Sequence, residues 1–443
     1  MKTKIILTAA VVGGLAFAAT VAPAASPSAA ATGKRPNIVI ILGDDLGFSD
    51  LGCFGGEIKT PRLDSLAKAG VRCTQFYTHA SCSPTRSMLL SGTDTHRNGL
   101  GNMDEWTAPN QMGKPGYEGY LHTRVATLPQ LLKDSGYHTY MVGKWHMGKK
   151  PDLIPVARGF ERDFALLDGA GSYWDMLNFT ASNPKSTYTE DGRYLKKLPK
   201  DYYATKTYTD KMIGYIEANR RDGKPFFAYV SHQAPHDPYH LPRDWRNRHV
   251  GEYDKGWDAV RRERLKRQVE LGVTPAGTEL AERMWFVPDP IVLAPAPRAV
   301  LGKKMELYAG MVENMDFHIG RLIDYLKKIG EYDNTIFIVF GDNGAEVRLR
   351  GRLHSGPHRR RVERGAQSLR DWRRDAGGGP GVCARAGAHA RCAGRRRVWH
   401  ARGGRQGQGL DRRGLLPARR RGPGDPGEGG GNPAAAQVVC DGG

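Results

Sequence analysis

Short continuous runs of apolar residues recur along the first 346 positions of the chain and predict buried strands. They are rich in β-branched and aromatic residues, which is typical of strands covered on both faces of a parallel sheet. These runs lie at 37–42, 226–230 and 335–340. We expect two further strands, at 138–142 and over the alternating segment Val71–Tyr77.

Helical patterns separate these strands. Residues 60–70 and 127–137 each begin with a threonine, carry a proline in the first turn and reach a glycine at their end. Apolar residues recur at helical spacing over Met305–Ile329, and we interpret its methionines as core residues. The polar segment Tyr253–Pro290 is expected to cross the surface. A chain of 443 residues favours one large α/β domain or two domains.

Oxygen-bearing side chains directly follow two of the predicted strands. Asp44 and Asp45 follow the first strand, and Asp342 and Asn343 follow the last. Open α/β sheets bind ligands at the carboxyl ends of their strands. Closely spaced carboxylate and amide oxygens suit Ca²⁺ or Mg²⁺ better than zinc. Both aspartates can face one site only if the chain turns there, and the alternative for this pair alone is an Asx-type turn.

Cationic side chains follow the strand at 138–142. Lys144 and His146 lie two residues apart, so in extended backbone their side chains share one face and can reach the same anion. The alternative is an exposed lysine beside a structural histidine.

The segment Cys82-Ser-Pro-Thr-Arg86 places a cysteine at the predicted start of a helix. Ser83 is the predicted N-cap, Pro84 suits the first turn and Gly92 is the predicted end. Cys82 then lies beside free backbone N–H groups at the positive end of the helix dipole, where an anion is favoured. Arg86, one turn later, can reach the same point. A buried structural cysteine is the alternative for this segment taken alone.

The first residues have the pattern of a secretory signal. Two lysines precede the apolar run 5–19, which is short and rich in small residues for a membrane span. We expect a signal peptide at 1–25, a linker at 26–35 and a secreted or periplasmic protein. An uncleaved membrane anchor is the alternative.

Six scattered cysteines are too few for a disulfide framework, and without a Cys-x-x-Cys pair we expect no structural zinc site. Cys53 and Cys73 could form a disulfide, and their spacing in the sequence does not decide whether they do.

Composition changes sharply after Glu346. The formal charge of the chain is +20, and residues 347–443 hold 22 Arg, no Lys and 7 acidic residues. The same stretch has no Ile, Phe, Tyr, Met or Thr, so we find no strand or helix pattern and expect disorder. One hypothesis is an Arg/Gly-rich tail that binds a polyanion. The hypothesis that we favour is a shifted reading frame in a GC-rich gene, because the missing residues largely have AT-rich codons.

Taken in chain order, these segments resemble the sulfatase family. The resemblance covers residues from about 35 to 346. The sequence of Tyr253–Asp258 is similar to that of bacterial arylsulfatases. The matching motifs are Pro-Asn-Ile-Val from Pro36, Asp-Asp-Leu-Gly from Asp44, Thr-Pro-x-Leu-Asp-x-Leu-Ala from Thr60, Cys-x-Pro-x-Arg from Cys82, Gly-Lys-Trp-His from Gly143, Ala-Pro-His-x-Pro from Ala234 and Asp-Asn from Asp342.

The resemblance implies an α/β, alkaline phosphatase-like fold for residues 36–346, with a mixed, mostly parallel sheet flanked by helices. This part is an incomplete catalytic domain, and 347–443 is not family-like. In the family a maturation enzyme oxidises the cysteine that matches Cys82 to formylglycine, whose hydrated aldehyde is the nucleophile. The resemblance also implies one Ca²⁺ ion, held by Asp44, Asp45, Asp342, Asn343 and the group at Cys82.

Further roles follow from the resemblance. Arg86 and Lys144 neutralise charge on the transferring sulfate. His236 hydrogen-bonds the sulfate or the leaving oxygen, because the family motif matches there, and His232 is expected to be structural. His146 deprotonates the remaining hydroxyl so that sulfate is released. A further lysine of the family has no match in this chain.

We therefore expect a sulfuric ester hydrolase that acts on a small sulfate ester. Aromatic residues in the loops 102–119 and 169–191 or directly beside them (Tyr117, Tyr120, Tyr173 and Trp174) favour the arylsulfatase type. The alternatives are a phosphate or phosphonate ester hydrolase of the same superfamily, and a truncated, inactive chain with a polyanion-binding tail. We expect no specific nucleic-acid partner and no membrane association after signal cleavage.

Overall fold

The computed structural model describes residues 34–180, 183–284, 287–345 and 437–440 of the chain. The described residues from Pro36 onward belong to one compact unit. The predicted signal peptide and nearly all of the predicted linker lie outside the described residues, as does most of the stretch after Glu346. None of the helices in the described ranges combines the length and the hydrophobicity that a membrane crossing needs.

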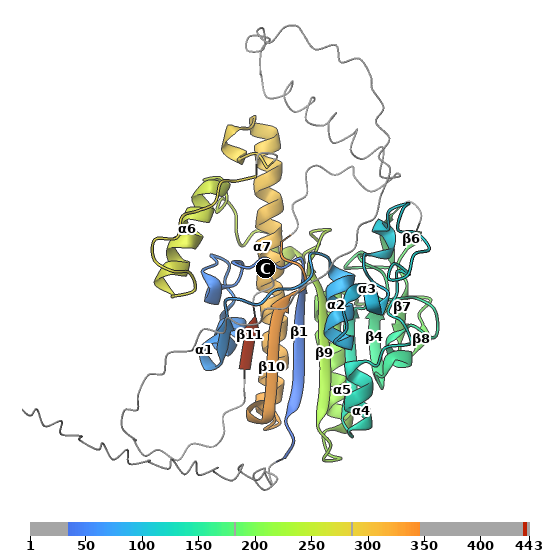
Figure 1. Cartoon of the computed structure of the whole chain (residues 1–443). Helices are drawn as coiled ribbons and strands as arrows, with labels where there is room; N and C mark the ends of the chain where they lie inside the picture. The colour runs from blue at the N-terminus through green and yellow to red at the C-terminus, as the bar shows by residue number, and fades with distance from the viewer. Residues whose placement is uncertain (1–33, 181–182, 285–286, 346–436, 441–443) are drawn as a thin grey trace, which may run out of the picture. The chain divides into compact units, whose positions relative to one another are not determined.

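A nine-stranded sheet forms the centre of this unit, with the order β2-β11-β10-β1-β9-β3-β4-β7-β8 (Figure 1). The strands from β2 to β4 in this order are parallel to their neighbours, and β7 and β8 are antiparallel. A separate hairpin pairs β5 with β6. The strands are β1 (Asn37–Asp44), β2 (Val71–Cys73), β3 (His138–Lys144), β4 (Arg162–Leu166), β5 (Leu177–Thr180), β6 (Asn183–Lys185), β7 (Tyr188–Glu190), β8 (Arg193–Tyr194), β9 (Phe226–Pro235), β10 (Thr335–Gly341) and β11 (Gln437–Cys440).

Helices cover both faces of the sheet. The packing contacts place α1, α5 and α7 on one face, and α2 and α4 on the other (Figure 1). The α-helices are α1 (Pro61–Ala69), α2 (Cys82–Ser91), α3 (Thr95–Asn98), α4 (Leu128–Asp134), α5 (Ala204–Asn219), α6 (Trp257–Glu270) and α7 (Pro295–Lys328).

The central strand β1 shows why the sequence folds in this way. Val39 and Ile41 pack in the core beneath α7, whereas Ile40 and Leu42 pack in the core beneath α2. Successive side chains of a strand point to opposite faces, so a run without polar interruptions must be covered on both sides. The predicted α/β fold with a mostly parallel sheet flanked by helices is confirmed.

Several predicted boundaries change. The strand predicted over Val71–Tyr77 ends at Cys73, whereas the strand that begins at Phe226 runs five residues beyond its predicted end at Val230, to Pro235. The helix predicted from Met305 begins at Pro295, because a proline fits the first helical turn. Cys53 and Cys73 are both free thiols, so the pairing that the sequence left open is not formed.

Four residues near the end of the chain correct our view of the stretch after Glu346. We expected no strand there, yet β11 lies between β10 and β2 and is parallel to both. The edges of β10 and β2 offer N–H and C=O groups for pairing, so a short segment can join the sheet through its backbone without a periodic pattern of its own. The rest of the predicted disordered or frameshifted stretch lies outside the described residues.

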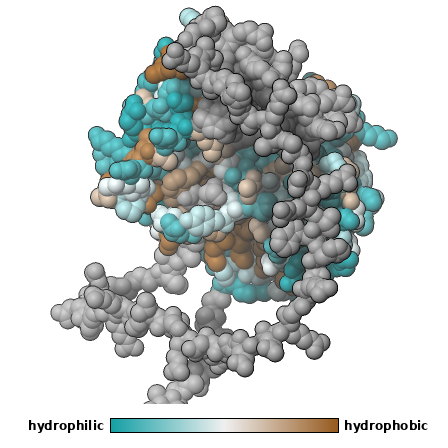
Figure 2. All heavy atoms as spheres, turned by 45° about the horizontal axis from the view of Figure 1, so that its top comes forward, coloured by the Kyte–Doolittle hydropathy of each residue, from teal (hydrophilic) through white to brown (hydrophobic). Residues whose placement is uncertain are grey.

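The segment predicted to cross the surface contains α6. This helix is strongly charged, with only Val260 and Gln268 buried. Figure 2 shows hydrophilic side chains with scattered hydrophobic ones on the side where Figure 1 has α6. Arg264 points inward from it and forms ion pairs with Asp50 and Glu57, so the segment is fixed to the loop that follows β1.

Candidate active site

Cys82 begins α2 at the edge of the sheet where the parallel strands end. The N-cap is Ser81 rather than the predicted Ser83, so Cys82 occupies the first helical position. Gly92 ends the helix in the left-handed conformation, as predicted. The side chain of Cys82 is buried, and its Sγ lies 3.3 Å from His146 Nδ1 and 3.4 Å from Met103 Sδ. The helix start thus presents the thiol to a histidine.

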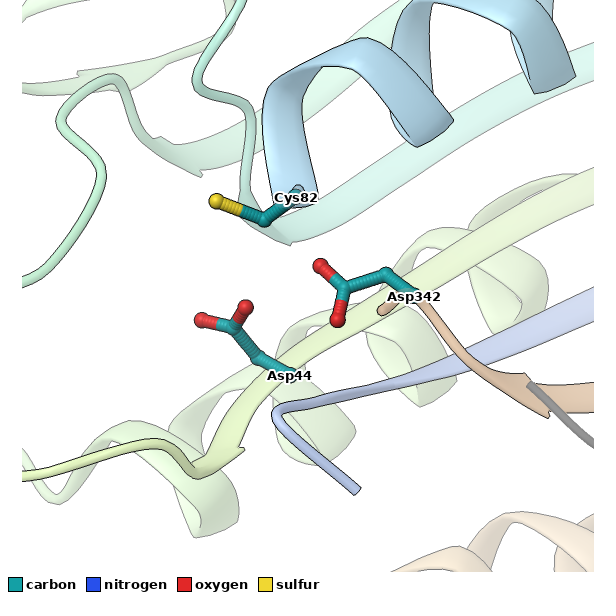
Figure 3. A group of neighbouring side chains, drawn as sticks. All are labelled: Asp44, Cys82 and Asp342. Atoms are coloured by element: carbon teal, nitrogen blue, oxygen red, sulfur yellow. The ribbon is translucent and has the colours of Figure 1, made fainter. Parts of the chain in front are cut away.

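Acidic side chains from two adjacent strands meet this thiol. Asp44 ends β1 and Asp342 follows β10, and Figure 3 shows both carboxylates directed toward the start of α2. Ligand atoms of Asp44, Asp342 and Cys82 all lie within 4.8 Å of one another. The two strands are paired in parallel, which places their carboxyl ends side by side. The sequence prediction of acidic groups at one edge is confirmed.

Asp45 reaches the same site because the chain turns at this residue. Its φ of 60° is left-handed, a conformation that aspartate tolerates better than most residues. Its Oδ1 accepts a hydrogen bond of 2.8 Å from Asn343 Nδ2, and its Oδ2 lies 3.5 Å from His236 Nε2. The predicted turn is present, and both aspartates face the site.

Two buried cations face these acids. Arg86 is fully buried, with Nη2 2.6 Å from Asp342 Oδ2 and 3.3 Å from Asp44 Oδ1. The Nζ of Lys144 lies 2.9 and 2.7 Å from the two carboxylate oxygens of Asp44. Gly143 precedes Lys144 with a φ of 97°, and a Cβ there would lie 1.8 Å from the Ser231 carbonyl oxygen. Only glycine fits this approach between β3 and β9.

Burial and charge together set the pKa values of these groups. Burial raises the pKa of Asp45, and burial together with the Asp44 charge raises the pKa of Asp342. Burial alone would also raise the pKa of Asp44, but the charges of Lys144, His236 and Arg86 together outweigh burial and lower that pKa. Burial would lower the pKa of Lys144 and of Arg86, yet their carboxylate partners raise both above the ordinary values. Both cations therefore stay charged at neutral pH.

His146 reaches Cys82 by a different route from the predicted one. We expected extended backbone from Lys144 to His146, but His146 has a φ of 57°. This left-handed turn directs its ring to Cys82 while Lys144 remains on Asp44. Both side chains are in the site, as predicted, and the assumption of extended backbone is wrong.

Glu105 is a site residue that the sequence analysis missed. Its Oε1 lies 2.9 Å from His146 Nε2, on the far side of the ring from Cys82. Burial would lower the pKa of His146, but Glu105 and Cys82 raise it to about 9. Partial burial would raise the pKa of Glu105, whose side chain is still 44% exposed, but the charge of His146 and its hydrogen bond with the carboxylate lower the pKa to about 2. Glu105 lies in a short 3-10 helix, Asp104–Trp106, and no spacing pattern in the sequence singles it out.

The two histidines that follow Val230 separate as predicted. His236 lies beside Asp45, and burial, which would lower its pKa, is outweighed by Asp45 and Asp44, which raise the pKa to about 10. His232 lies in β9 with its ring near Tyr208, and burial lowers its pKa to about 3. His236 is thus a charged group at the site, and His232 is a neutral core residue.

A hard cation fits the oxygen donors at this edge of the sheet. Asp44, Asp45 and Asp342 supply carboxylates, and Asn343 supplies an amide oxygen. Asn343 Oδ1 is buried and has no hydrogen-bond partner among the residues that the structure describes, although the amide nitrogen is fully used. A buried polar atom without a partner is costly, and a bound cation would satisfy it.

The four aromatic residues predicted in the substrate loops differ from one another in burial and in packing partners. Tyr173 is fully buried, and its hydroxyl donates to the backbone carbonyls of Gln233 and His236, so it supports the His236 loop from within. Trp174 is 38% exposed and packs against Tyr203, and the ring of Tyr117 packs edge-on against His96. Tyr120 packs edge-on against His122.

Known proteins of one family are similar to this chain over the part that carries these motifs. The family model described as Sulfatase matches residues 36–367, which continues past Glu346, where our resemblance ended. An uncharacterised sulfatase of Schizosaccharomyces pombe is 44% identical over 335 residues, covering 71% of this chain and 59% of the relative. An arylsulfatase of Klebsiella aerogenes is 38% identical over 322 residues, covering 71% and 68%. The chain thus spans about three fifths to two thirds of these relatives.

Solved structures share the fold. A Bacteroides fragilis protein assigned as a sulfatase superposes with a TM-score of 0.52 at 21% identity, covering 72% of this chain and 64% of that one. At this identity the likeness concerns the fold alone.

Proposed function

The chain belongs to the sulfatase family, and from this membership we propose that it hydrolyses sulfate esters as an arylsulfatase-type enzyme. One observation carries the proposal. The Cys82 thiol at the start of α2 lies within one cluster with Asp44 and Asp342, against the ring of His146. A site of this kind combines a nucleophile position, a base and buried charges of both signs.

We propose that a maturation enzyme converts Cys82 to formylglycine, whose hydrated aldehyde supplies the nucleophile. Lys144 and Arg86 provide fixed positive charge beside it and favour an anionic group there. His146 takes or returns a proton at position 82, from which its Nδ1 is 3.3 Å distant. His236 hydrogen-bonds the sulfate or the leaving oxygen.

One Ca²⁺ ion is part of the proposal. Asp44, Asp45, Asp342 and Asn343 would hold it, together with the group at position 82, because their oxygens suit a hard cation. Calcium would supply positive charge to a transferring sulfate and to the nucleophile. The unpartnered Asn343 Oδ1 supports this assignment.

We further propose a small aryl sulfate as substrate and export to the periplasm or the medium. The substrate proposal rests on the likeness to the Klebsiella aerogenes arylsulfatase. The proposal of export rests on the amino-terminal sequence pattern alone.

The test compares Cys82→Ala with Cys73→Ala. The chain and both variants are produced together with a formylglycine-generating enzyme, and release of a phenol from an aryl sulfate is followed. We expect Cys82→Ala to lose turnover by at least about a thousandfold with an unchanged melting temperature, because the nucleophile is removed. Cys73 is a free thiol in β2, so Cys73→Ala should retain turnover.

Two outcomes contradict the proposal. Equal turnover in the parent chain and Cys82→Ala excludes a nucleophile at position 82. A parent chain that hydrolyses the matching aryl phosphate a hundredfold faster than the sulfate is instead a phosphate ester hydrolase of the same superfamily.

A further inference from the structure

The left-handed backbone of Asp45 is supported from outside the site. The φ of 60° at this residue directs its carboxylate toward Asn343 and His236. Left-handed backbone at a residue other than glycine costs free energy, and surrounding contacts stabilise it where it occurs. The groups that contact the Asp45 backbone on the side away from the site are the Tyr308 hydroxyl and its partner Asp50.

Tyr308 of α7 contacts the Asp45 backbone directly. Its hydroxyl oxygen lies 3.0 Å from the Asp45 carbonyl oxygen and 2.5 Å from Asp50 Oδ2. The same Asp50 oxygen accepts a hydrogen bond of 2.8 Å from the amide of Gly47. Burial and the Asp50 carboxylate raise the pKa of Tyr308 well above its ordinary value, so the hydroxyl keeps its proton. The single phenolic proton of Tyr308 is thus shared between two oxygen acceptors, the Asp50 carboxylate and the Asp45 carbonyl.

Asp50 is in turn fixed by α6. Arg264 Nη1 lies 2.6 Å from Asp50 Oδ1, and the other side of the same guanidinium holds Glu57 at 2.6 and 2.7 Å. The side chain of Arg264 is only 13% exposed, and a forked pair of this kind has little freedom to move. A chain of hydrogen bonds thus runs from Arg264 of α6 through Asp50 and Tyr308 to the Asp45 carbonyl.

We propose that Tyr308 is a positioning residue for the cation site: it holds Asp45 in the turn that presents its carboxylate to the ion. The inference rests on the proposed calcium site. Tyr308 is not among the proposed ligands, and its effect passes through the backbone of Asp45. Residues that orient ligands in this way commonly change metal affinity by tenfold to a hundredfold when they are altered.

The test is Tyr308→Phe, which removes the hydroxyl and keeps the ring. Calcium binding is measured by calorimetric titration of the chelator-treated full chain, and the melting temperature is recorded in chelator. We expect calcium affinity to fall roughly tenfold, because the Asp45 carbonyl would then lose its contact with the Tyr308 hydroxyl and the turn at Asp45 would be held less firmly. The matched control is Tyr325→Phe on the same helix, whose hydroxyl donates to Glu217. Its calcium affinity should equal that of the parent.

The outcomes separate this inference from the proposed function. Equal calcium affinity in the parent and Tyr308→Phe, with both folded, overturns the role of Tyr308 and leaves the sulfatase proposal intact. Equal losses in both tyrosine variants also overturn it, because the effect would then belong to α7 as a whole. A parent chain that binds no calcium overturns the calcium assignment and this inference together, whatever its turnover of aryl sulfate.

Discussion

At the scale of single residues, Glu105 determines how His146 faces position 82. The carboxylate lies against Nε2, which leaves Nδ1 for the sulfur of Cys82. A negative charge behind the ring stabilises the imidazolium that forms when the other nitrogen accepts a proton. Replacement by glutamine keeps an oxygen acceptor for the ring and removes that charge.

We expect Glu105→Gln to lower kcat by roughly tenfold to a hundredfold and to change KM little. The measurement is steady-state hydrolysis of an aryl sulfate by the matured chain. The control is Asp104→Asn, which removes the same charge one residue earlier in the same 3-10 helix. Equal losses in both variants would mean that the charge of the loop matters, and that the contact with His146 does not.

Most residues of the site could be predicted because they follow buried strands. Parallel strands end at one edge of a sheet, so Asp44, Lys144 and Asp342 had to lie close together once their strands were recognised. Glu105 could not be found in this way, since it reaches the site from a loop. The orientation of His146 could not be found either, because a left-handed residue within a non-glycine segment leaves no pattern in the sequence.

At the scale of elements, α1 depends on α7 for its amino-terminal cap. Thr60 occupies the N-cap position that the sequence predicted, but its hydroxyl donates to Asp64 and does not cap the helix. Instead Asp316 of α7 accepts hydrogen bonds from the amides of Leu63, at 2.8 Å, and Arg62, at 3.2 Å. The free N–H groups of one helix are thus satisfied by the carboxylate of another.

We expect Asp316→Ala to reduce the free energy of unfolding by about 1–3 kcal/mol, since the buried amide of Leu63 and the partly buried amide of Arg62 lose their acceptor. Urea unfolding at neutral pH measures the change. Asp324→Ala on the same helix is the matched control. Its ion pair with Arg62 is exposed, with side chains 46% and 52% accessible, so its loss should cost less than about 1 kcal/mol. A larger cost for Asp324→Ala than for Asp316→Ala would contradict the cap.

Elements with a strong local pattern were predictable, and elements that depend on neighbours were not. β1 and β10 are continuous apolar runs, and both appear at their predicted positions. β2 loses its last four predicted residues because only Val71–Cys73 finds a partner in the sheet. β11 is missed for the converse reason, since its pairing comes from β10 and β2 and not from its own sequence.

At the scale of the whole molecule, His232 links the stability of the core to pH. Its side chain is fully buried in β9, and neither ring nitrogen has a hydrogen-bond partner among the residues that the structure describes. Burial lowers its pKa from 6.5 to about 3, and the nearby His318 adds to the effect. In the unfolded chain the same ring is in water and takes up a proton near pH 6.5.

The sign of the pH effect follows from this difference. Above pH 6.5 neither state binds the proton, so the folded state has no disadvantage. Between pH 6.5 and about 3 only the unfolded state binds it, and the free energy of unfolding falls as the pH falls. The slope is about 1.4 kcal/mol per pH unit, so the loss from this residue at pH 5 is roughly 2 kcal/mol.

We expect His232→Leu to lose about 2 kcal/mol less stability than the parent between pH 7.5 and pH 5.0. The substitution breaks no hydrogen bond, because the ring has no partner in the described part of the chain. Urea unfolding at the two pH values measures the difference. His96→Leu is the control, since it replaces a histidine whose side chain is 54% exposed and lies outside the core. Parallel losses in the parent and His232→Leu would show that His232 is not held neutral by burial, and that the acid sensitivity of the fold arises from its carboxylates.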